Sequence, residues 1–232
     1  PQSDGTAHPA VLLAASLAGV DEIYKVGGAQ AVAAMAYGTE SIDKVQKIFG
    51  PGNSWVTAAK SIVSSDPDGS AIDLPAGPSE VLVIPDKYAS AEFVAADLLS
   101  QAEHGIDSHV LLVTDDFDLA KSVQKEIDNQ LLSLSRSEIA SATLKNSNTI
   151  VAKDIYSAVQ ISNLYAPEHL ILQTREPRDL LDKIRNSGSV FVGEWAPESV
   201  GDYCSGTNHV LPTYGYASAY SGLGVEQFMR QM

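Results

Sequence analysis

Cysteine is almost absent from this chain of 232 residues, which has a single one, Cys204. One cysteine excludes an intramolecular disulfide and any zinc or iron site built mainly from thiolates, so we expect a reducing compartment, the cytoplasm. Cys204 itself has no histidine or basic residue close to it in sequence. This setting favours a small buried side chain over a nucleophile.

Basic residues and long apolar runs are scarce as well. The chain has 15 Lys and Arg against 29 Asp and Glu, a formal net charge of −14. An acidic surface repels nucleic acids and anionic lipids, and no basic patch opposes it, so we expect neither a nucleic acid nor a membrane partner. The longest apolar stretches, such as 31–36, fall far short of the roughly 20 residues that a membrane-spanning helix needs.

What the chain does contain is an alternation of short apolar runs, rich in β-branched residues, with longer segments of helical period. The predicted strands are 23–26, 45–49, 81–84, 110–113, 170–172 and 190–192. The predicted helices are 29–37, 54–64, 89–103, 119–134, 155–165 and 178–186. This order predicts an α/β fold with largely parallel sheets flanked by helices.

Segment 71–79 breaks the alternation, because it has two prolines, a glycine and no sustained periodicity. We interpret it as an interdomain crossing between a lobe formed by 1–79 and a lobe formed by 80–223, with a functional site in the cleft between them. Residues 224–232 then begin a C-terminal tail. Because the chain starts with Pro1 and stops directly after an amphipathic run, we expect it to be a piece of a longer polypeptide.

Two turns in the first lobe join a predicted strand to a predicted helix through glycines, GGAQ at 27–30 and GPGN at 50–53. Glycine there lets a phosphate approach the N–H groups of a helix N-terminus, and Gln30 or Asn53 can add a side-chain contact. Neither turn has the dinucleotide fingerprint or the lysine of a P-loop. The alternative is a plain tight turn, for which glycine is the usual residue.

Three polar groups interrupt the apolar sequence: Gln101 with His104, Glu168 with His169, and Asp202 with His209. Gln101 and His104 are three residues apart at the end of a predicted helix, so the amide and the imidazole can share one face. In the alternative, His104 interacts with the helix dipole and Gln101 is solvated.

Glu168 and His169 follow Pro167 and precede a predicted strand, a position at which a rigid scaffold holds side chains. A carboxylate beside an imidazole offers two bases of different strength, which suits a reaction with two proton transfers. The alternative is a turn with an exposed Glu168 and with His169 packed at the strand edge. His8 and His109 stand alone in sequence, and we expect both to be structural.

Asp202 lies in the aperiodic segment 201–209, which has few charges and is typical of a loop that folds over something polar. The alternative is an ordinary surface turn. If Gln101, His104 and Asp202 meet, they supply two oxygen ligands and one nitrogen ligand. This set suits zinc or another borderline divalent ion and leaves at least one coordination position for a substrate.

Six motifs in order resemble the histidinol dehydrogenase family along essentially the whole chain: GGAQA at 27–31, FGPGN at 49–53, PAGPSE at 75–80, SQAEH at 100–104, PEHL at 167–170 and GTNH at 206–209. The resemblance implies incomplete Rossmann-like sheets, a nucleotide-binding lobe at 1–79 and a zinc and catalytic lobe at 80–223. It also implies oxidation of L-histidinol through an aldehyde to L-histidine with two NAD+ and one zinc, the last step of histidine biosynthesis.

The resemblance implies a role for most of the candidate residues. Gln101, His104 and Asp202 match zinc ligands that also contact the substrate, and Ser79 matches a substrate contact. Gln30 and Asn53 match NAD contacts. His169 matches the base that deprotonates the alcohol and contacts the substrate, and Glu168 matches the base that activates water. We assign no role to His209.

In this family a further zinc ligand and a substrate-binding Glu come from a C-terminal tail, the former given by the partner subunit of a homodimer. This chain stops before that tail, and an upstream part of the nucleotide-binding lobe is missing too. We therefore expect the fragment alone to be inactive or nearly so. Two alternatives differ in class: a non-catalytic dimerising or scaffold segment of a multifunctional chain, and a metal-dependent hydrolase with Glu168 as base.

Overall fold

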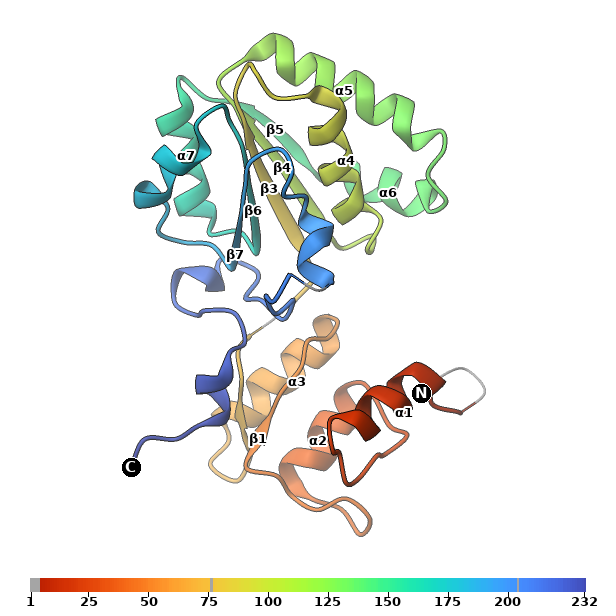
Figure 1. The fold of residues 1–232 in the computed structure, drawn as a ribbon. Coiled ribbons are helices and arrows are strands. Elements are labelled where there is room, and N and C mark those ends of the chain that lie inside the picture. Colours follow the sequence, from red (N-terminus) through yellow and green to blue (C-terminus); the bar gives the residue numbers. More distant parts are fainter. Residues whose placement is uncertain (1–4, 76, 204) are drawn as a thin grey trace. The chain divides into compact units, whose positions relative to one another are not determined.

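The computed structural model describes residues 5–75, 77–203 and 205–232. In these ranges the chain forms two compact units, one that ends at Asp73 and one that begins at Leu74 (Figure 1). Each unit has its own parallel sheet, with two strands in the first unit and five in the second. None of the helices in the described ranges combines the length and the apolar character that crossing a membrane requires.

The first unit builds a small core around a two-stranded sheet. Its elements are α1 (Pro9–Leu17), α2 (Ala29–Tyr37), β1 (Lys47–Ile48), α3 (Ser54–Ser65) and β2 (Ala71–Ile72). Buried Val32 and Ala36 of α2 pack with Ile48 and Val63. Lys60 of α3 is also buried, and its ammonium group pairs with the carboxylate of Asp73. This ion pair connects α3 to the segment that follows β2.

One strand prediction for this unit is wrong. Residues 23–26 form no strand, because no neighbouring strand in the described part of the unit pairs with them, and Ile23 and Tyr24 are exposed. The segment 71–79, interpreted from the sequence as an interdomain crossing, begins with a short strand, because Ala71 and Ile72 pair with β1 as β2. Helix α1 was not predicted, and it has no buried residue. Its apolar side chains are therefore not part of the hydrophobic core of this unit.

The second unit is organised around a five-stranded sheet in the order β5-β4-β3-β6-β7. The strands are β3 (Glu80–Pro85), β4 (His109–Thr114), β5 (Asn148–Val151), β6 (His169–Gln173) and β7 (Ser189–Val192). Every neighbouring pair described is parallel, and Val81 of β3 is in register with His169 of β6. The α/β class with parallel sheets flanked by helices is therefore confirmed.

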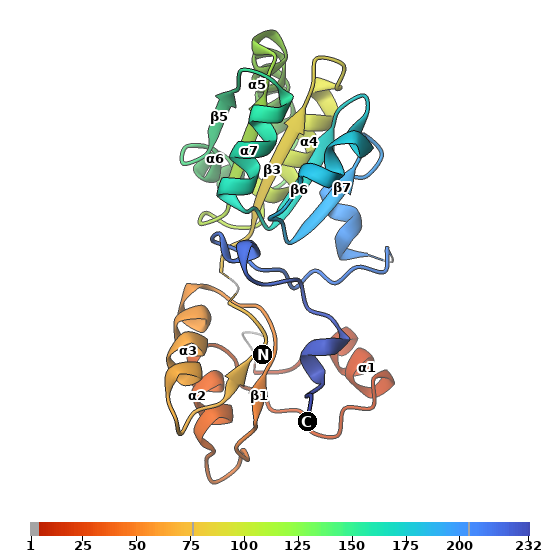
Figure 2. The ribbon, with the colours of Figure 1, turned by 90° about the vertical axis from the view of Figure 1, so that its left-hand side faces the viewer.

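Helices cover both faces of this sheet (Figure 2). These helices are α4 (Ala91–Ala102), α5 (Phe117–Leu131), α6 (Ser137–Leu144) and α7 (Ile155–Tyr165). The unit also has the 3-10 helices η1 (Pro177–Lys183), η2 (Glu198–Asp202), η3 (Tyr216–Ser218) and η4 (Val225–Phe228). Alternate residues of the central strands point to opposite faces, so Val81 and Val83 pack with α4 and α5 whereas Leu82 and Ile84 pack with α7.

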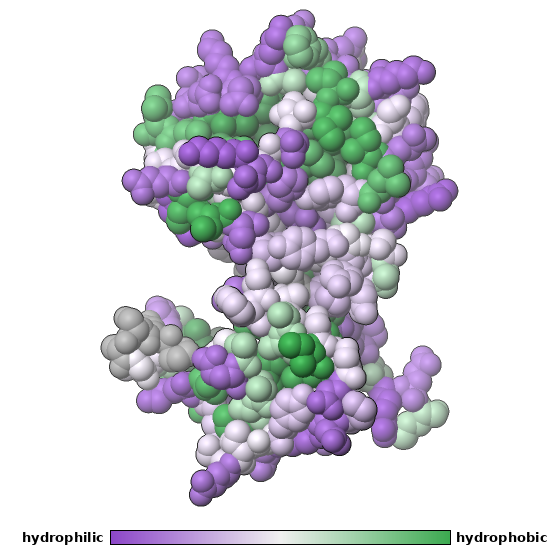
Figure 3. Space-filling view, turned by 180° about the vertical axis from the view of Figure 1, so that it is seen from behind, coloured by the Kyte–Doolittle hydropathy of each residue, from purple (hydrophilic) through white to green (hydrophobic). Residues whose placement is uncertain are grey.

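Sequence patterns identified the buried elements of this unit and missed the exposed ones. Strand β5 was not predicted, because it is a mostly exposed edge strand without a continuous apolar run. Helix α6 was not predicted either, and it is only eight residues long. The predicted α-helix at 178–186 is the 3-10 helix η1. Figure 3 shows apolar patches between the hydrophilic side chains of this unit, and Leu132 and Leu164 are 89% and 87% exposed.

Candidate active site

Glu168 and His169 lie between the end of α7 and the start of β6, at the amino edge of the sheet. Ala166 ends α7 in the left-handed conformation, with φ of 54°, and His169 is the first residue of β6. Gly188 passes close by, since a Cβ atom there would stand 2.6 Å from the carbonyl oxygen of Glu168. Both side chains are buried, with 4% and 7% exposure. The alternative with an exposed Glu168 is therefore wrong.

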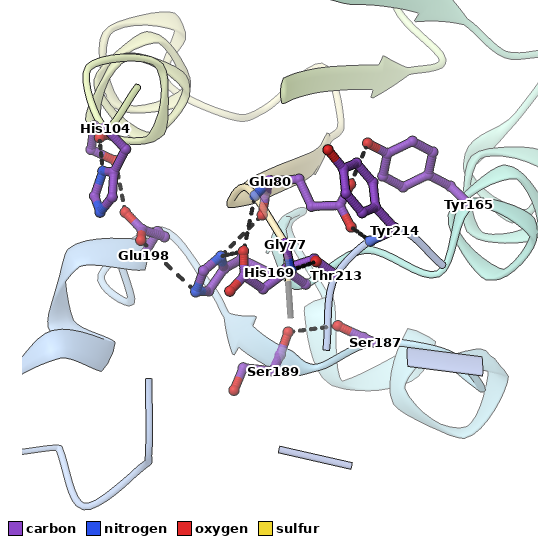
Figure 4. A network of polar contacts seen from close by, with 12 residues as sticks. Gly77, Glu80, His104, Tyr165, His169, Ser187, Ser189, Glu198, Thr213 and Tyr214 are labelled. Atoms are coloured by element: carbon purple, nitrogen blue, oxygen red, sulfur yellow. Dashed lines mark hydrogen bonds and ion pairs between the residues drawn. The ribbon is translucent and has the colours of Figure 1, made fainter. Parts of the chain in front are cut away.

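The backbone of Glu80, the first residue of β3, binds both members of this pair (Figure 4). Its N–H donates to Oε2 of Glu168 at 2.9 Å, and its carbonyl oxygen lies 3.0 Å from Nδ1 of His169. A carbonyl oxygen only accepts hydrogen bonds, so Nδ1 carries the proton of the neutral ring. Nε2 then has the free lone pair and is the nitrogen that can take up a proton.

The environment keeps Glu168 protonated and His169 neutral near pH 7. Burial raises the pKa of Glu168 to about 9, and the negative charges of Glu80 and Glu198 act in the same direction. Hydrogen bonds from the Glu80 N–H and from Ser79 oppose this rise. Burial lowers the pKa of His169, while the charges of Glu198 and Asp202 raise it. The pair thus combines a neutral imidazole base with a carboxyl group that loses its proton only in alkaline solution.

The side chain of Glu80 is fixed by a separate set of hydrogen bonds. Its Oε2 accepts from the hydroxyl of Tyr165 at 2.8 Å, and its Oε1 accepts from the N–H of Tyr214 at 2.9 Å. The hydroxyl of Tyr165 also lies 2.6 Å from Nδ1 of His109. Burial raises the pKa of the Glu80 carboxyl. These contacts hold the first residue of β3, and therefore the backbone groups that bind Glu168 and His169.

Gln101 and His104 lie at the carboxyl end of α4. Gln101 is 0% exposed, and neither atom of its amide has a hydrogen-bond partner among the described residues. The alternative of a solvated Gln101 is therefore wrong. His104 is exposed, and its Nδ1 lies 3.1 Å from the carbonyl oxygen of Ser100. By the same reasoning as for His169, Nδ1 is the donor and Nε2 of His104 has a free lone pair.

Asp202 is the last residue of η2 and is exposed. The charges of Asp202 and His104 both act on the pKa of His169, in opposite directions. Asp202 and His104 therefore both lie close enough to His169, at the amino edge of the sheet, to interact with it electrostatically. Ser79, which precedes β3, is half-buried and hydrogen-bonds to Glu168.

Two buried carboxyl groups of this region, those of Glu198 and Asp97, were missed by the sequence patterns. Glu198, the first residue of η2, lies with Oε1 3.9 Å from Nε2 of His169, and its Oε2 is 2.9 Å from the hydroxyl of Ser100. Asp97 accepts hydrogen bonds from the Glu198 N–H and from Nε2 of Gln173. Burial raises the pKa of Asp97 to about 6. The spacing of Asp97 and Gln101, four residues apart on one helix face, was a signal that could have identified Asp97.

Two further candidates, Gln30 and Asn53, lie far from this group in the sequence. Gln30 is an exposed residue of α2, and its amide lies beside Gly28, whose φ is 77°. Asn53 is the N-cap of α3, where Oδ1 accepts from the N–H groups of Trp55 and Val56 at 3.1 Å each. Both belong to the first unit. His209 is exposed, and Cys204 lies outside the described residues.

The donor set at the end of α4 fits a metal ion in its chemistry. A buried amide without partners and an imidazole with a free Nε2 are both available, and the second nitrogen of His104 binds a backbone carbonyl, as is usual for metal-ligating histidines. In the described ranges, no three His, Cys, Asp or Glu side chains are arranged to hold a metal by themselves. The ligand set expected from the sequence has only two side chains of these types, His104 and Asp202, because its third member, Gln101, is an amide.

Comparison with known proteins gives a consistent result. A family model described as histidinol dehydrogenase matches residues 1–232. A histidinol dehydrogenase of Yersinia pestis is 59% identical over 222 residues, which cover 96% of this chain and 50% of that protein. A putative histidine biosynthesis bifunctional protein, HisCD, of Photorhabdus laumondii is 60% identical over 222 residues, which cover 96% of this chain and 28% of that protein.

A crystal structure of histidinol dehydrogenase from Elizabethkingia anophelis matches with a TM-score of 0.90 and 55% identity, over 94% of this chain and 50% of that chain. The chain thus spans about half the length of the Yersinia relative and of this solved structure.

Proposed function

The chain belongs to the histidinol dehydrogenase family, and we propose that the complete protein containing it oxidises L-histidinol through the aldehyde to L-histidine. The observation that carries the proposal is the buried pair of a neutral His169, with a free lone pair on Nε2, and a protonated Glu168. Two bases of different strength suit two successive oxidations: His169 in its neutral form, and Glu168 once it has lost its proton.

His169 is the proposed base of the first oxidation. Its Nε2 takes the proton from the hydroxyl of the substrate, while Nδ1 stays bound to the carbonyl oxygen of Glu80 and keeps the ring oriented. Glu168 is the proposed base of the second oxidation, which requires water to add to the aldehyde. Because its pKa is raised to about 9, the fraction of Glu168 able to act as a base increases with pH through neutrality.

Gln101, His104 and Asp202 are the proposed zinc ligands. The unpartnered buried amide of Gln101 supports this role, because a buried polar group without a partner is costly unless something binds it. Zinc there would fix the imidazole and amine of the substrate, and NAD+ would accept the hydride. Within this chain, Ser79 is the proposed additional substrate contact.

The unit that carries Gln30 and Asn53 is the proposed NAD-binding part, within a nucleotide-binding lobe at 1–79, and 80–223 is the proposed zinc and catalytic lobe. The N–H groups at the start of α3 are partly occupied by Asn53, so a contact of Asn53 with the cofactor would use its amide nitrogen. We place the complete protein in the cytoplasm, without a nucleic acid or membrane partner.

We further propose that the complete protein is a homodimer and that this fragment alone is inactive or nearly so. The exposed apolar surface of α1 supports a covering segment or subunit, since Val11, Leu13 and Leu17 are 60%, 61% and 81% exposed. The proposed ligand set also lacks a fourth protein ligand, which a partner subunit would supply.

A second candidate is a non-catalytic segment of a multifunctional chain, and the match to the bifunctional relative fits the multifunctional part of this alternative. One experiment separates the two. The complete protein, loaded with zinc, is mixed with L-histidinol and NAD+, and NADH formation is followed by absorbance, while zinc binding is titrated by calorimetry. We expect two NADH per L-histidinol and near one zinc per subunit, lost in His104→Ala. A complete protein that binds zinc but forms no NADH would contradict the proposed activity.

A further inference from the structure

Glu198 is a buried carboxyl group that the proposed reaction does not yet use. It is 3% exposed, and its Oε1 lies 3.9 Å from Nε2 of His169. Figure 4 shows it between the end of α4 and His169. A buried carboxyl group is costly unless its surroundings stabilise it, so its position calls for a physical reason.

The contacts of Glu198 show that its orientation is fixed from two sides. Its Oε2 lies 2.9 Å from the hydroxyl of Ser100, and its backbone N–H donates to Oδ1 of Asp97 at 3.3 Å. Both partners belong to α4. The other oxygen of Asp97 accepts from Nε2 of Gln173 at the end of β6. Glu198 is therefore anchored to the helix and, through Asp97, to the strand that begins with His169.

The two carboxyl groups next to His169 stand at different ring nitrogens. Oε2 of Glu168 lies 3.6 Å from Nδ1, the nitrogen already bound to the Glu80 carbonyl, whereas Oε1 of Glu198 lies on the side of Nε2. Since Nε2 is the proton-accepting nitrogen, the charge that the ring gains in the reaction develops next to Glu198. Glu168, with its pKa raised to about 9, carries no charge at neutral pH.

We infer that Glu198 is a positioning residue for His169: its carboxylate stabilises the imidazolium formed when Nε2 of the ring takes a proton from the alcohol. This inference rests on the proposed function. In that step the hydroxyl proton moves to Nε2, the hydride leaves the carbon with two electrons for NAD+, and the C–O bond becomes C=O. Removing Glu198 should therefore weaken proton transfer and leave substrate affinity and metal binding largely intact.

The charged groups that act on His169 are Glu198 and Asp202, which favour the imidazolium, and His104, which opposes it. Glu198 is the largest of the favourable contributions. Loss of its charge lowers the pKa of His169, so the acidic limb of the dependence of kcat/KM on pH should move to lower pH. A purely structural role for Glu198 would not move this limb.

The test uses two variants of the complete zinc-loaded enzyme. Glu198→Gln removes the negative charge, and Glu198→Asp keeps the charge but moves the carboxylate oxygens away from His169. Glu194→Gln is the matched control, because Glu194 is exposed and lies on the segment leading into η2. We expect Glu198→Gln to lower kcat with L-histidinol by roughly tenfold to a hundredfold, less than the full contribution of a general base, with little change in KM or zinc content.

We also expect the acidic limb of the kcat/KM profile of Glu198→Gln to shift to lower pH. Glu198→Asp should have an intermediate kcat and an acidic limb at the wild-type pH. Glu194→Gln should behave like the wild type. If Glu198→Gln does not fold, Glu198→Asp alone decides through its kcat. A wild-type kcat in either Glu198 variant overturns the inference. So does a loss of kcat in Glu198→Gln that is explained by loss of zinc and leaves the acidic limb of kcat/KM at the wild-type pH. If the complete wild-type enzyme forms no NADH, the proposed function itself is refuted. This outcome differs from one in which the wild type is active and the Glu198 variants do not behave as expected.

Discussion

The carboxyl group of Glu168 accepts a hydrogen bond from the backbone N–H of Glu80 at 2.9 Å, so the first residue of β3 holds the residue that precedes β6. The donor is a backbone group and does not change its protonation state. A glutamine at 168 can place its amide oxygen at the same position. Glu168→Gln is therefore a variant that removes the acid–base chemistry of residue 168 while retaining this contact.

Glu168→Gln in the complete enzyme should impair oxidation of the aldehyde more than oxidation of the alcohol, because only the second oxidation requires Glu168 to activate water. The expected loss in kcat with L-histidinal is roughly a hundredfold or more, the usual contribution of a general base. Steady-state rates with L-histidinol and L-histidinal, followed as NADH, measure the difference. His169→Asn is the comparison, and it should impair both steps. Equal losses for both substrates in Glu168→Gln would count against this division of roles.

The stability of this chain should decrease as the pH rises from about 4.5 to about 9, because burial raises the pKa of Glu168 from 4.5 to about 9. The folded state then binds a proton that the unfolded state has lost, so the stabilisation is complete below pH 4.5 and is lost as the pH passes through the raised pKa. In Glu168→Gln the decrease should be smaller, although not absent, since the pKa values of Asp97 and Glu80 are also raised.

Urea denaturation at several pH values measures this effect, and the two tryptophans allow each unit to be followed separately. Trp55 lies in α3 of the first unit and Trp195 follows β7 in the second. In a Trp55→Phe background, the fluorescence of Trp195 reports the unfolding of the unit that contains Glu168. The same dependence on pH with and without Glu168→Gln would show that this carboxyl group does not carry the proton.

Gln101→Leu should stabilise the metal-free chain and weaken zinc binding in the complete enzyme. Neither amide atom of Gln101 has a hydrogen-bond partner in the described ranges, so an apolar side chain of similar volume removes an unfavourable burial. The free energy of unfolding should rise by about 1 kcal/mol, the lower end of the cost of an unsatisfied buried group. Zinc affinity should fall by at least roughly tenfold, because a proposed ligand is lost.

Gln173→Leu is the matched control for this prediction. Gln173 is also buried, but its Nε2 donates to Asp97 at 2.6 Å. Its loss should lower the free energy of unfolding by about 1–3 kcal/mol. Urea denaturation followed by Trp195 compares the two variants, and calorimetry gives the zinc affinity. Destabilisation by Gln101→Leu, or unchanged zinc affinity, would be the opposite of what we expect.

Lys60→Met should strongly destabilise the first unit. The ammonium group of Lys60 pairs with Asp73 and donates to the carbonyl oxygen of Gly50 at 2.8 Å, and Lys60 is 2% exposed. Its loss leaves the charge of Asp73 buried, at a cost of about 3–5 kcal/mol. Denaturation followed by Trp55 in a Trp195→Phe background measures this change.

Two further variants control the Lys60→Met experiment. Adding Asp73→Asn should recover part of the lost stability, because the buried charge that Lys60 neutralised is gone. Lys44→Met should change stability by no more than about 0.5 kcal/mol, since Lys44 is an exposed residue whose contact is at the surface. A small effect of Lys60→Met, similar to that of Lys44→Met, would show that the ion pair does not stabilise the unit.

Local sequence was sufficient for the elements that bury apolar side chains. The predicted helices 29–37 and 155–165 coincide with α2 and α7, and the apolar runs at 81–84, 110–113 and 170–172 lie inside the central strands β3, β4 and β6. The run at 23–26 has a similar composition but no partner strand in the described residues, and β5 pairs at the edge with few buried residues. Strand formation depends on a neighbour that the local sequence does not specify.

By itself, the sequence determined the residue types of the proposed site and the order of the six motifs that carry the family resemblance. Only the tertiary structure placed Glu198 beside Nε2 of His169 and the Glu80 N–H on Glu168, contacts between residues 29 and 88 positions apart. The physical reason is that these contacts follow from the register of parallel strands and from the anchoring of η2 to α4. Both are set by packing between distant segments, and no periodicity within either segment encodes them.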